Sequence, residues 1–291
     1  MQSKKIPKRY PINHSPLYRI KGKEQFKKAL NVDWSSINKL LAESNYRVWI
    51  NDKGREIQQP IRWLAQIHNR IGKLLSRIDL PEYVYSQKGR SYADNARIHI
   101  GNIPLIKTDI CTFFPSTTWK MVFQMFKNDF KCAIDVSHLL ADICCYKQEH
   151  LPTGSPLSGR VAYFAAKHMF DQISDMALNN NCQMSLYVDD LTISGPGATK
   201  TLLAQIRKTI SRHGYKTKRT KSITYSPEAV KSVTGTVVAS DALRLPNERH
   251  KKIWETRKML ASANPSDKMQ LQRSLKGRIQ EAKQITNKDD E

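Results

Sequence analysis

Two adjacent aspartates, Asp189 and Asp190, are the residues in this sequence best suited to catalysis. They lie inside an apolar, β-branched stretch over residues 184–194, a pattern that predicts a β-hairpin with both acids at or beside its tip. Like charges so close together resist joint ionisation, and a bound divalent cation removes that cost. Carboxylate oxygens suit Mg²⁺. The alternative is a solvated turn, where adjacent acids are common.

A third carboxylate is needed before such a pair can hold two metal ions. The candidate is Asp109, which ends an apolar strand that begins near Ile103. A strand end and a hairpin tip can meet in one sheet, and three carboxylates there can hold two Mg²⁺ ions for phosphoryl transfer. One ion would activate the attacking oxygen and the other would stabilise the leaving phosphate.

Two further segments have residue types suited to a nucleotide. Phe113 and Phe114 follow Asp109 closely, and an aromatic ring there could lie under a sugar, although aromatics at helix starts are more often core residues. The loop that contains Thr153 and Gly154 is rich in Pro, Gly and Ser and precedes a helix. Its backbone could approach a nucleotide closely, and the alternative is an ordinary loop with a helix N-cap.

Composition indicates a polyanionic partner. The 291 residues include 48 Lys and Arg against 26 Asp and Glu, a net charge of +22, which favours nucleic acid. No apolar run is long enough to span a membrane, and the N-terminus lacks the apolar core of a signal peptide. The five cysteines show no CxxC spacing. We expect a cytoplasmic protein with reduced cysteines and no membrane contact.

The remaining pattern places these residues on an α+β framework. We expect an extended basic arm over residues 1–20 and helical segments over 21–41. A hairpin is predicted from Tyr46–Ile50 and 55–57, followed by a helix from Pro60 to Ile78. Helices are then predicted over 117–128, 136–147, 158–178, 201–213, 247–263 and 265–285, and strands over 222–225 and 232–238. The sheet should carry the acids on one side.

At this point the motifs resemble a known family. The series LIKTDICTFFPS, LPTGSPLSG, YVDDL and GYKTKRTKS, in that order and spacing, is similar to the palm motifs of reverse transcriptases. Asn95-Ala96-Arg97-Ile98-His99 resembles the NAxxH motif of bacterial retron reverse transcriptases, and Val233-Thr234-Gly235 resembles their VTG motif. The resemblance covers about residues 45–285, and the combined match is far more specific than any single motif.

The resemblance implies a right-hand polymerase: fingers, a palm with an antiparallel sheet and the YVDD hairpin, and a helical thumb. The expected divisions are a basic arm with helices over 1–44, fingers over 45–100, a palm over 101–240 and a thumb over 241–291. The cofactor implied is Mg²⁺, as two ions. The principal metal ligands would be Asp109 and Asp189; Asp190 would complete the triad, together with the backbone carbonyl of Ile110.

Further roles follow from the same resemblance. Lys221 would protonate the departing pyrophosphate, Arg55 would contact the incoming triphosphate, and Phe114 would screen out the ribose 2′-OH. Thr153 and Gly154 would lie in the nucleotide-binding loop, where Thr153 replaces the usual Gln and reaches less far toward the sugar. The structured RNA would be held by Asn95, His99 and the strand Val233, Thr234 and Gly235.

The leading hypothesis is therefore an RNA-directed DNA polymerase that uses dNTPs to copy its cognate non-coding RNA into single-stranded DNA. Retron enzymes start from a guanosine 2′-OH, leaving a branched RNA–DNA, and typically act with an effector protein in anti-phage defence. One alternative is a group II intron-like or other bacterial reverse transcriptase, although we expect no maturase or endonuclease segment. Another is a catalytically idle RNA-binding scaffold or antitoxin. Metal-dependent dNTP incorporation separates an enzyme from a scaffold.

Overall fold

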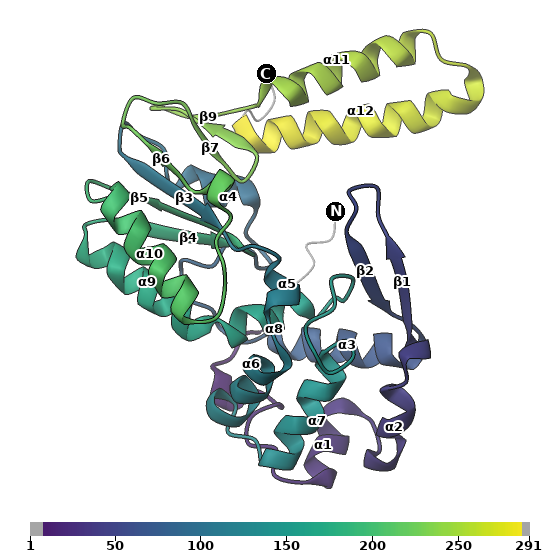
Figure 1. Ribbon diagram of the computed structural model, residues 1–291. Helices are drawn as coiled ribbons and strands as arrows, with labels where there is room; N and C mark the ends of the chain where they lie inside the picture. The colour runs from purple at the N-terminus through teal and green to yellow at the C-terminus, as the bar shows by residue number, and fades with distance from the viewer. Residues whose placement is uncertain (1–7, 287–291) are drawn as a thin grey trace. The chain divides into compact units, whose positions relative to one another are not determined.

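The chain, seen in a computed structural model that describes residues 8–286, divides into two units built from interleaved segments (Figure 1). Unit 1 comprises Met1–Glu82, Ile110–Asp175 and Ile206–Lys218, and unit 2 comprises Tyr83–Asp109, Met176–Gln205 and Arg219–Glu291. The helices α9 (Lys167–Asn179) and α10 (Lys200–Arg212) each cross a boundary between segments. Within residues 8–286, no helix combines the length and apolar composition that a membrane span requires.

Unit 1 is mainly helical, with one two-stranded antiparallel sheet formed by β1 and β2. Its elements are η1 (Ile12–His14), α1 (Lys23–Leu30), η2 (Trp34–Ser36), α2 (Ile37–Leu40), η3 (Glu43–Asn45), β1 (Tyr46–Ile50), β2 (Glu56–Pro60), α3 (Arg62–Leu75), α5 (Phe113–Ser116), α6 (Trp119–Gln124), η4 (Met125–Asp129), α7 (Ile134–Cys144) and α8 (Ser158–Ala165).

The predicted hairpin and the helix after it are both present in unit 1. Tyr46 pairs with Pro60 at one end of the β1–β2 ladder, and Gly54 has φ +69° in the connecting turn, a conformation that favours glycine. In α3 the buried apolar residues recur at helical spacing: Leu64, Ile67, Ile71 and Leu75. Burial of this face against the unit 1 core stabilises the helix.

Two predictions for unit 1 need correction. Residues 8–20 are not an extended arm, because Leu17 and Ile20 are buried and a helical turn, η1, interrupts the segment. The first seven residues of the predicted arm lie outside the described residues. The single helix predicted over 158–178 is two helices, since the backbone N–H of Ala166 bonds the carbonyls of both Ala162 and Tyr163 and ends α8.

Unit 2 contains two antiparallel sheets with strand orders β4-β5-β3-β6 and β7-β8-β9. Its elements are α4 (Tyr92–Arg97), β3 (Leu105–Asp109), β4 (Gln183–Tyr187), β5 (Asp190–Ser194), η5 (Arg219–Lys221), β6 (Ile223–Tyr225), β7 (Lys231–Val233), β8 (Thr236–Val238), β9 (Leu243–Arg244), α11 (Asn247–Ala261) and α12 (Pro265–Thr286). This mixture of helices and antiparallel sheets agrees with the predicted α+β class.

The four-stranded sheet contains the predicted acidic hairpin. Strands β4 and β5 are joined at Val188 and Asp189, and β3 pairs with β5 on one side and β6 on the other. Apolar residues of β3, β4 and β5 are buried, Leu105, Ile106, Leu186, Leu191 and Ile193 among them. The acids therefore follow strands whose register is fixed by buried neighbours.

The strand predicted over 232–238 is instead the hairpin β7–β8. Thr234 and Gly235 have φ of 44° and 77°, so the chain reverses at these two residues. The core beneath this hairpin is shared by α4, both sheets and the end of α12, and its buried members are Ala93, Ala96, Leu105, Val233, Val238, Leu243, Leu245 and Ile285. One apolar core thus fixes the hairpin against α4.

Candidate functional site

Three carboxylates lie at one end of the four-stranded sheet. Asp109 is the last residue of β3 and is directly opposite Asp190, the first residue of β5, in the antiparallel ladder. Asp189 precedes Asp190 in the turn between β4 and β5. Asp109 is only 6% exposed, and the other two are half-buried. Strand pairing thus places Asp109 beside the adjacent pair Asp189 and Asp190 at this end of the sheet.

The turn that carries Asp189 is conformationally strained. Tyr187 and Asp190 are paired in the ladder, so only Val188 and Asp189 make the connection. Val188 has φ +62°, a left-handed conformation that is costly for a β-branched residue. Such a conformation persists only where the surrounding structure enforces it. Here the paired strands on either side fix the backbone from which the Asp189 carboxylate extends.

Two lysines form ion pairs with Asp109 and Asp190. Lys221, in η5 just before β6, donates a hydrogen bond from Nζ to Oδ2 of Asp109. Lys107 Nζ lies 3.3 Å from Oδ2 of Asp190. Lys107 was not predicted as a member of this cluster. Its position two residues before Asp109 could have indicated that it lies beside the acids, because residues i and i+2 of a strand share a face.

Asp189 and Asp190 are both harder to ionise than a free aspartate. Burial is the larger cause, and repulsion from Asp109 the smaller, of a rise in the pKa of Asp189 to about 6. Burial also raises the pKa of Asp190, and the neighbouring Lys107 opposes that rise. The hydrogen bond to Asp109 raises the pKa of Lys221. A divalent cation would relieve the repulsion more completely than either ammonium group does.

The donor set fits Mg²⁺, since all three side chains offer hard oxygen ligands. Among residues 8–286, no three acidic, histidine or cysteine side chains converge as a metal-binding group. Asp190 and Asp109 are instead each held in an ion pair, with Lys107 and Lys221 respectively. Asp109, Asp189 and Asp190 are the residues that would hold the metal.

In unit 1, the loop with Thr153 and Gly154 lies against β2. Thr153 Oγ1 donates to the carbonyl of Glu56 at 2.7 Å, and its N–H donates to Gln58 Oε1 at 3.0 Å. The N–H of Gly154 donates to the carbonyl of Gln58, and a Cβ on Gly154 would come within 2.9 Å of that oxygen. Glycine is therefore required for this close approach. The anchoring role of Gln58 was not predicted.

The other predicted residues of unit 1 lie on separate elements. Arg55 precedes β2 at the exposed end of the hairpin, where its N–H donates to Asn51 Oδ1 at 3.0 Å. Phe114 is the second residue of the short helix α5 and is half-buried beside Phe113, with ring centroids 6.0 Å apart. Ile110 is buried and forms a bridge with Thr217.

Asn95 and His99, expected to contact RNA, are both fully buried. The two ring nitrogens of His99 bond the hydroxyls of Ser194 and Ser185, each at 2.7 Å, which ties the segment after α4 to β5 and β4. Both polar atoms of the Asn95 side chain are buried without a hydrogen-bond partner among the described residues. The side chains of Asn95 and His99 thus face the interior, whereas Gly235 of the VTG segment is exposed.

We expect acid to destabilise the protein through His99. Burial lowers its pKa to about 3, so the folded protein keeps the ring neutral, whereas the unfolded chain takes up a proton near pH 6.5. The free energy of unfolding should therefore be largest above pH 6.5 and fall by up to about 1.4 kcal/mol per pH unit as the pH drops toward 3. Thermal melts between pH 7 and 4 would measure this.

The matched variant for that experiment is His99→Gln. It should flatten the dependence of Tm on pH, and an unchanged slope would contradict the assignment. His68, buried in unit 1 with its pKa lowered to about 4, should account for the slope that remains.

Comparison with known proteins identifies the family of this chain. Residues 27–253 match the family described as reverse transcriptase (RNA-dependent DNA polymerase). The Ec86 retron reverse transcriptase of Escherichia coli is 29% identical over 225 residues, 73% of this chain and 69% of that protein. The Se72 retron reverse transcriptase of Salmonella heidelberg (strain 579083-10) is 30% identical over 171 residues, 56% of this chain and 44% of that protein.

Among solved structures, an apo telomerase from Candida tropicalis, truncated from its C-terminal domain, matches 69% of this chain and 54% of that chain. Its sequence identity is 11% and its TM-score 0.46, a level of similarity that supports no functional inference. The family match covers most of the chain and includes all three aspartates. This chain belongs to the reverse transcriptase (RNA-dependent DNA polymerase) family, in its bacterial retron branch, and is an RNA-directed DNA polymerase.

Proposed function

We propose that this reverse transcriptase copies its own structured non-coding RNA into single-stranded DNA, starting from the 2′-OH of a guanosine and leaving a branched RNA–DNA product. The NARIH and VTG segments, which resemble retron motifs, and the retron relatives support this proposal. The net charge of +22 suits an enzyme that holds an RNA and an RNA–DNA duplex through their phosphates.

The observation that carries the catalytic part is the pairing of Asp109 with Asp190, with Asp189 in the adjoining turn. We assign Asp109 and Asp189 as the main ligands of two Mg²⁺ ions, with Asp190 and the carbonyl of Ile110 completing the set. Bound ions would activate the attacking hydroxyl and stabilise the charge at the α-phosphate. Lys221 is the proton donor to pyrophosphate, since its ammonium group already lies at the cluster.

The right-hand assignment is part of the same proposal: fingers over 45–100, palm over 101–240 and thumb over 241–291. In the fingers, Arg55 would bind the triphosphate. Phe114 would exclude the ribose 2′-OH, and Thr153 and Gly154 would form the floor of the nucleotide site. The hydrogen bonds of Thr153 to β2 support a role in shaping that loop.

RNA recognition would involve the β7–β8 turn at Val233, Thr234 and Gly235, with Asn95 and His99 supporting it from the interior. We place the enzyme in an anti-phage defence system, where its RNA–DNA product would act with an effector protein. The relatives named as retron reverse transcriptases support that context.

The test is to purify the protein from cells that carry its native genomic neighbourhood and to extract the bound nucleic acid. Denaturing gels with and without RNase and debranching enzyme would compare wild type, Asp189→Ala and the surface control Asp241→Ala. We expect a DNA band that shifts on debranching, that persists in Asp241→Ala and that is absent from Asp189→Ala. DNA that does not respond to debranching would reject 2′ priming, and RNA alone in every sample would favour the scaffold alternative.

A further inference from the structure

Helices α11 and α12 are joined to the rest of unit 2 mainly at one end. Figure 1 shows them as an antiparallel pair that extends away from β9, connected to each other at the far end. The only buried residue described in α11 is Thr256, and the only one described in α12 is Ile285. The direction of the pair therefore depends on a small set of contacts at its base.

A polar triangle forms one part of that base. Arg249 of α11 donates from Nη1 to Glu281 Oε1 of α12 at 2.6 Å and to the hydroxyl of Tyr92 of α4 at 3.0 Å. The Tyr92 hydroxyl donates to the same Glu281 oxygen at 2.8 Å. The guanidinium of Arg249 also lies over the Tyr92 ring, 5.4 Å from its centroid. Each of the three helices contributes one residue.

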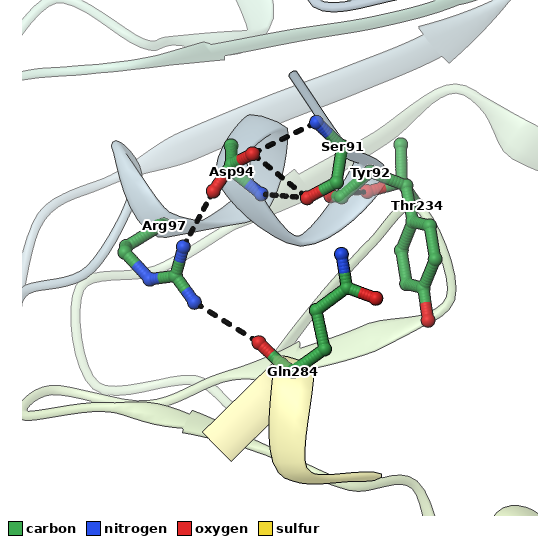
Figure 2. Close-up of polar contacts among 6 residues, drawn as sticks. All are labelled: Ser91, Tyr92, Asp94, Arg97, Thr234 and Gln284. Atoms are coloured by element: carbon green, nitrogen blue, oxygen red, sulfur yellow. Dashed lines mark hydrogen bonds and ion pairs between the residues drawn. The ribbon is translucent and has the colours of Figure 1, made fainter. Parts of the chain in front are cut away.

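A second link joins α4 to the end of α12, as Figure 2 shows. Arg97 donates from Nη1 to Asp94 at 2.6 Å and from Nη2 to the backbone carbonyl of Gln284 at 3.2 Å. Asp94 is itself fixed, because it forms a capping box with Ser91 at the start of α4. The last turn of α12 is therefore bonded to a side chain whose position is already determined.

The β7–β8 turn contacts two of the same residues, Tyr92 and Arg249. Thr234 Oγ1 donates to the carbonyl of Tyr92 at 2.8 Å (Figure 2). Gly235 lies so close to Arg249 that a Cβ at this position would be 3.1 Å from Nη2. The turn, α4, α11 and α12 thus meet at one tyrosine and one arginine.

Small movements at this base are amplified along the helices. With 22 residues, α12 is about 33 Å long at 1.5 Å per residue, so a rotation of about 10° at its base moves the far end by roughly 6 Å. The ion pair of Arg249 and Glu281 is partly exposed, and Tyr92 adds hydrogen bonds through its hydroxyl and a cation–π contact through its ring.

We propose that Tyr92, Arg249 and Glu281 form a latch that holds the α11–α12 pair at a fixed angle to α4 and to the β7–β8 turn. The three are positioning residues for DNA synthesis: they keep the helical pair against the growing RNA–DNA duplex between nucleotide additions. This inference rests on the proposed function, in which α11 and α12 form the thumb.

The first experiment measures the angle directly and needs no activity. Spin labels introduced as unnatural amino acids at the exposed positions Val230 and Met269 of the full chain would report the distance distribution between sheet and helices. We expect a clearly broader distribution in Tyr92→Phe, which loses only the hydroxyl, and in Arg249→Met. Glu248→Gln, which breaks the surface pair with Lys252 on the same helix, should leave it unchanged. Identical distributions in all four proteins would overturn the latch.

The second experiment measures product length per binding event on a primed RNA template in the presence of a heparin trap. We expect Tyr92→Phe and Arg249→Met to shorten products roughly five-fold, the scale of losing one ordinary hydrogen bond, with the rate of first-nucleotide addition unchanged. The charge-exchanged double variant Arg249→Glu with Glu281→Arg should regain length that each single variant loses.

Equal loss of first addition and of product length would indicate a general folding defect and would overturn the positioning role, as would a double variant no better than the singles. If the wild-type protein makes no DNA but the label distributions respond as expected, the latch stands and the proposed function fails. The two ideas are therefore separable.

Discussion

Asp189→Asn should lower the rate of DNA synthesis by roughly 10³-fold or more, measured as dNTP incorporation with Mg²⁺. The substitution removes an anionic ligand while keeping the size of the side chain, and the charge stabilisation lost is worth several kcal/mol, at about 1.4 kcal/mol for each factor of ten. Binding of the RNA should be retained, since Asp189 is an anion in a turn and contributes no attraction for phosphate.

The same variant should melt at or above the wild-type temperature. Burial and repulsion from Asp109 raise the pKa of Asp189 to about 6, so its ionised form is unfavourable in the folded protein at pH 7. Removing that charge relieves the repulsion. The control is Asp241→Asn, in an exposed ion pair with Arg244 of the same unit. Full activity in Asp189→Asn would refute the metal assignment, and a large loss of Tm would show that the defect lies in folding.

Lys221→Met should reduce the rate of nucleotide addition by roughly 10²-fold, the usual scale for losing a positioned proton donor. The variant also deprives Asp109 of its ion-pair partner, so loss of rate alone would not identify the chemical role. Single-turnover incorporation of one dNTP at saturating concentration is the appropriate measurement, because it separates the chemical step from binding.

Lys221→Arg separates the two effects. Arginine keeps the positive charge beside Asp109 but does not release its proton at neutral pH. We expect Lys221→Arg to melt like the wild type and to be nearly as slow as Lys221→Met. An arginine variant with almost wild-type rate would show that Lys221 acts only as a counter-charge to Asp109.

Much of the catalytic centre could be predicted from the sequence because its signals are local. Apolar and β-branched residues around Asp189 and Asp190 required a strand on each side, and the observed β4–β5 hairpin confirms that prediction. The hairpin at Tyr46–Ile50 was equally clear, because aromatic and β-branched residues are followed by the turn residues Asn51 to Gly54. The helix α3 was clear from its apolar residues at helical spacing. The order of the motifs was enough to indicate the family.

The wrong secondary-structure predictions fall where a local sequence pattern is compatible with two different structures. Residues 232–238 are mostly β-branched, which predicts one strand, yet Thr234 and Gly235 reverse the chain. The stretch 158–178 has unbroken helical periodicity, and the break at Ala166 leaves no mark in the sequence. A turn is stabilised by what packs beneath it, and that packing involves residues distant along the chain.

The sequence by itself determined which residues are the candidates for the chemistry: three carboxylates, a lysine and the strands near which they lie. Only the tertiary structure decided their partners. It pairs Lys107 with Asp190, encloses His99 between Ser185 and Ser194, and joins Tyr92 to Arg249 and Glu281. Each of these contacts links side chains far apart in the chain, and periodicity contains no information about such distances. Strand register and the packing of shared cores determine these distances. A buried polar group needs a hydrogen-bond partner, and that partner is often distant in the sequence.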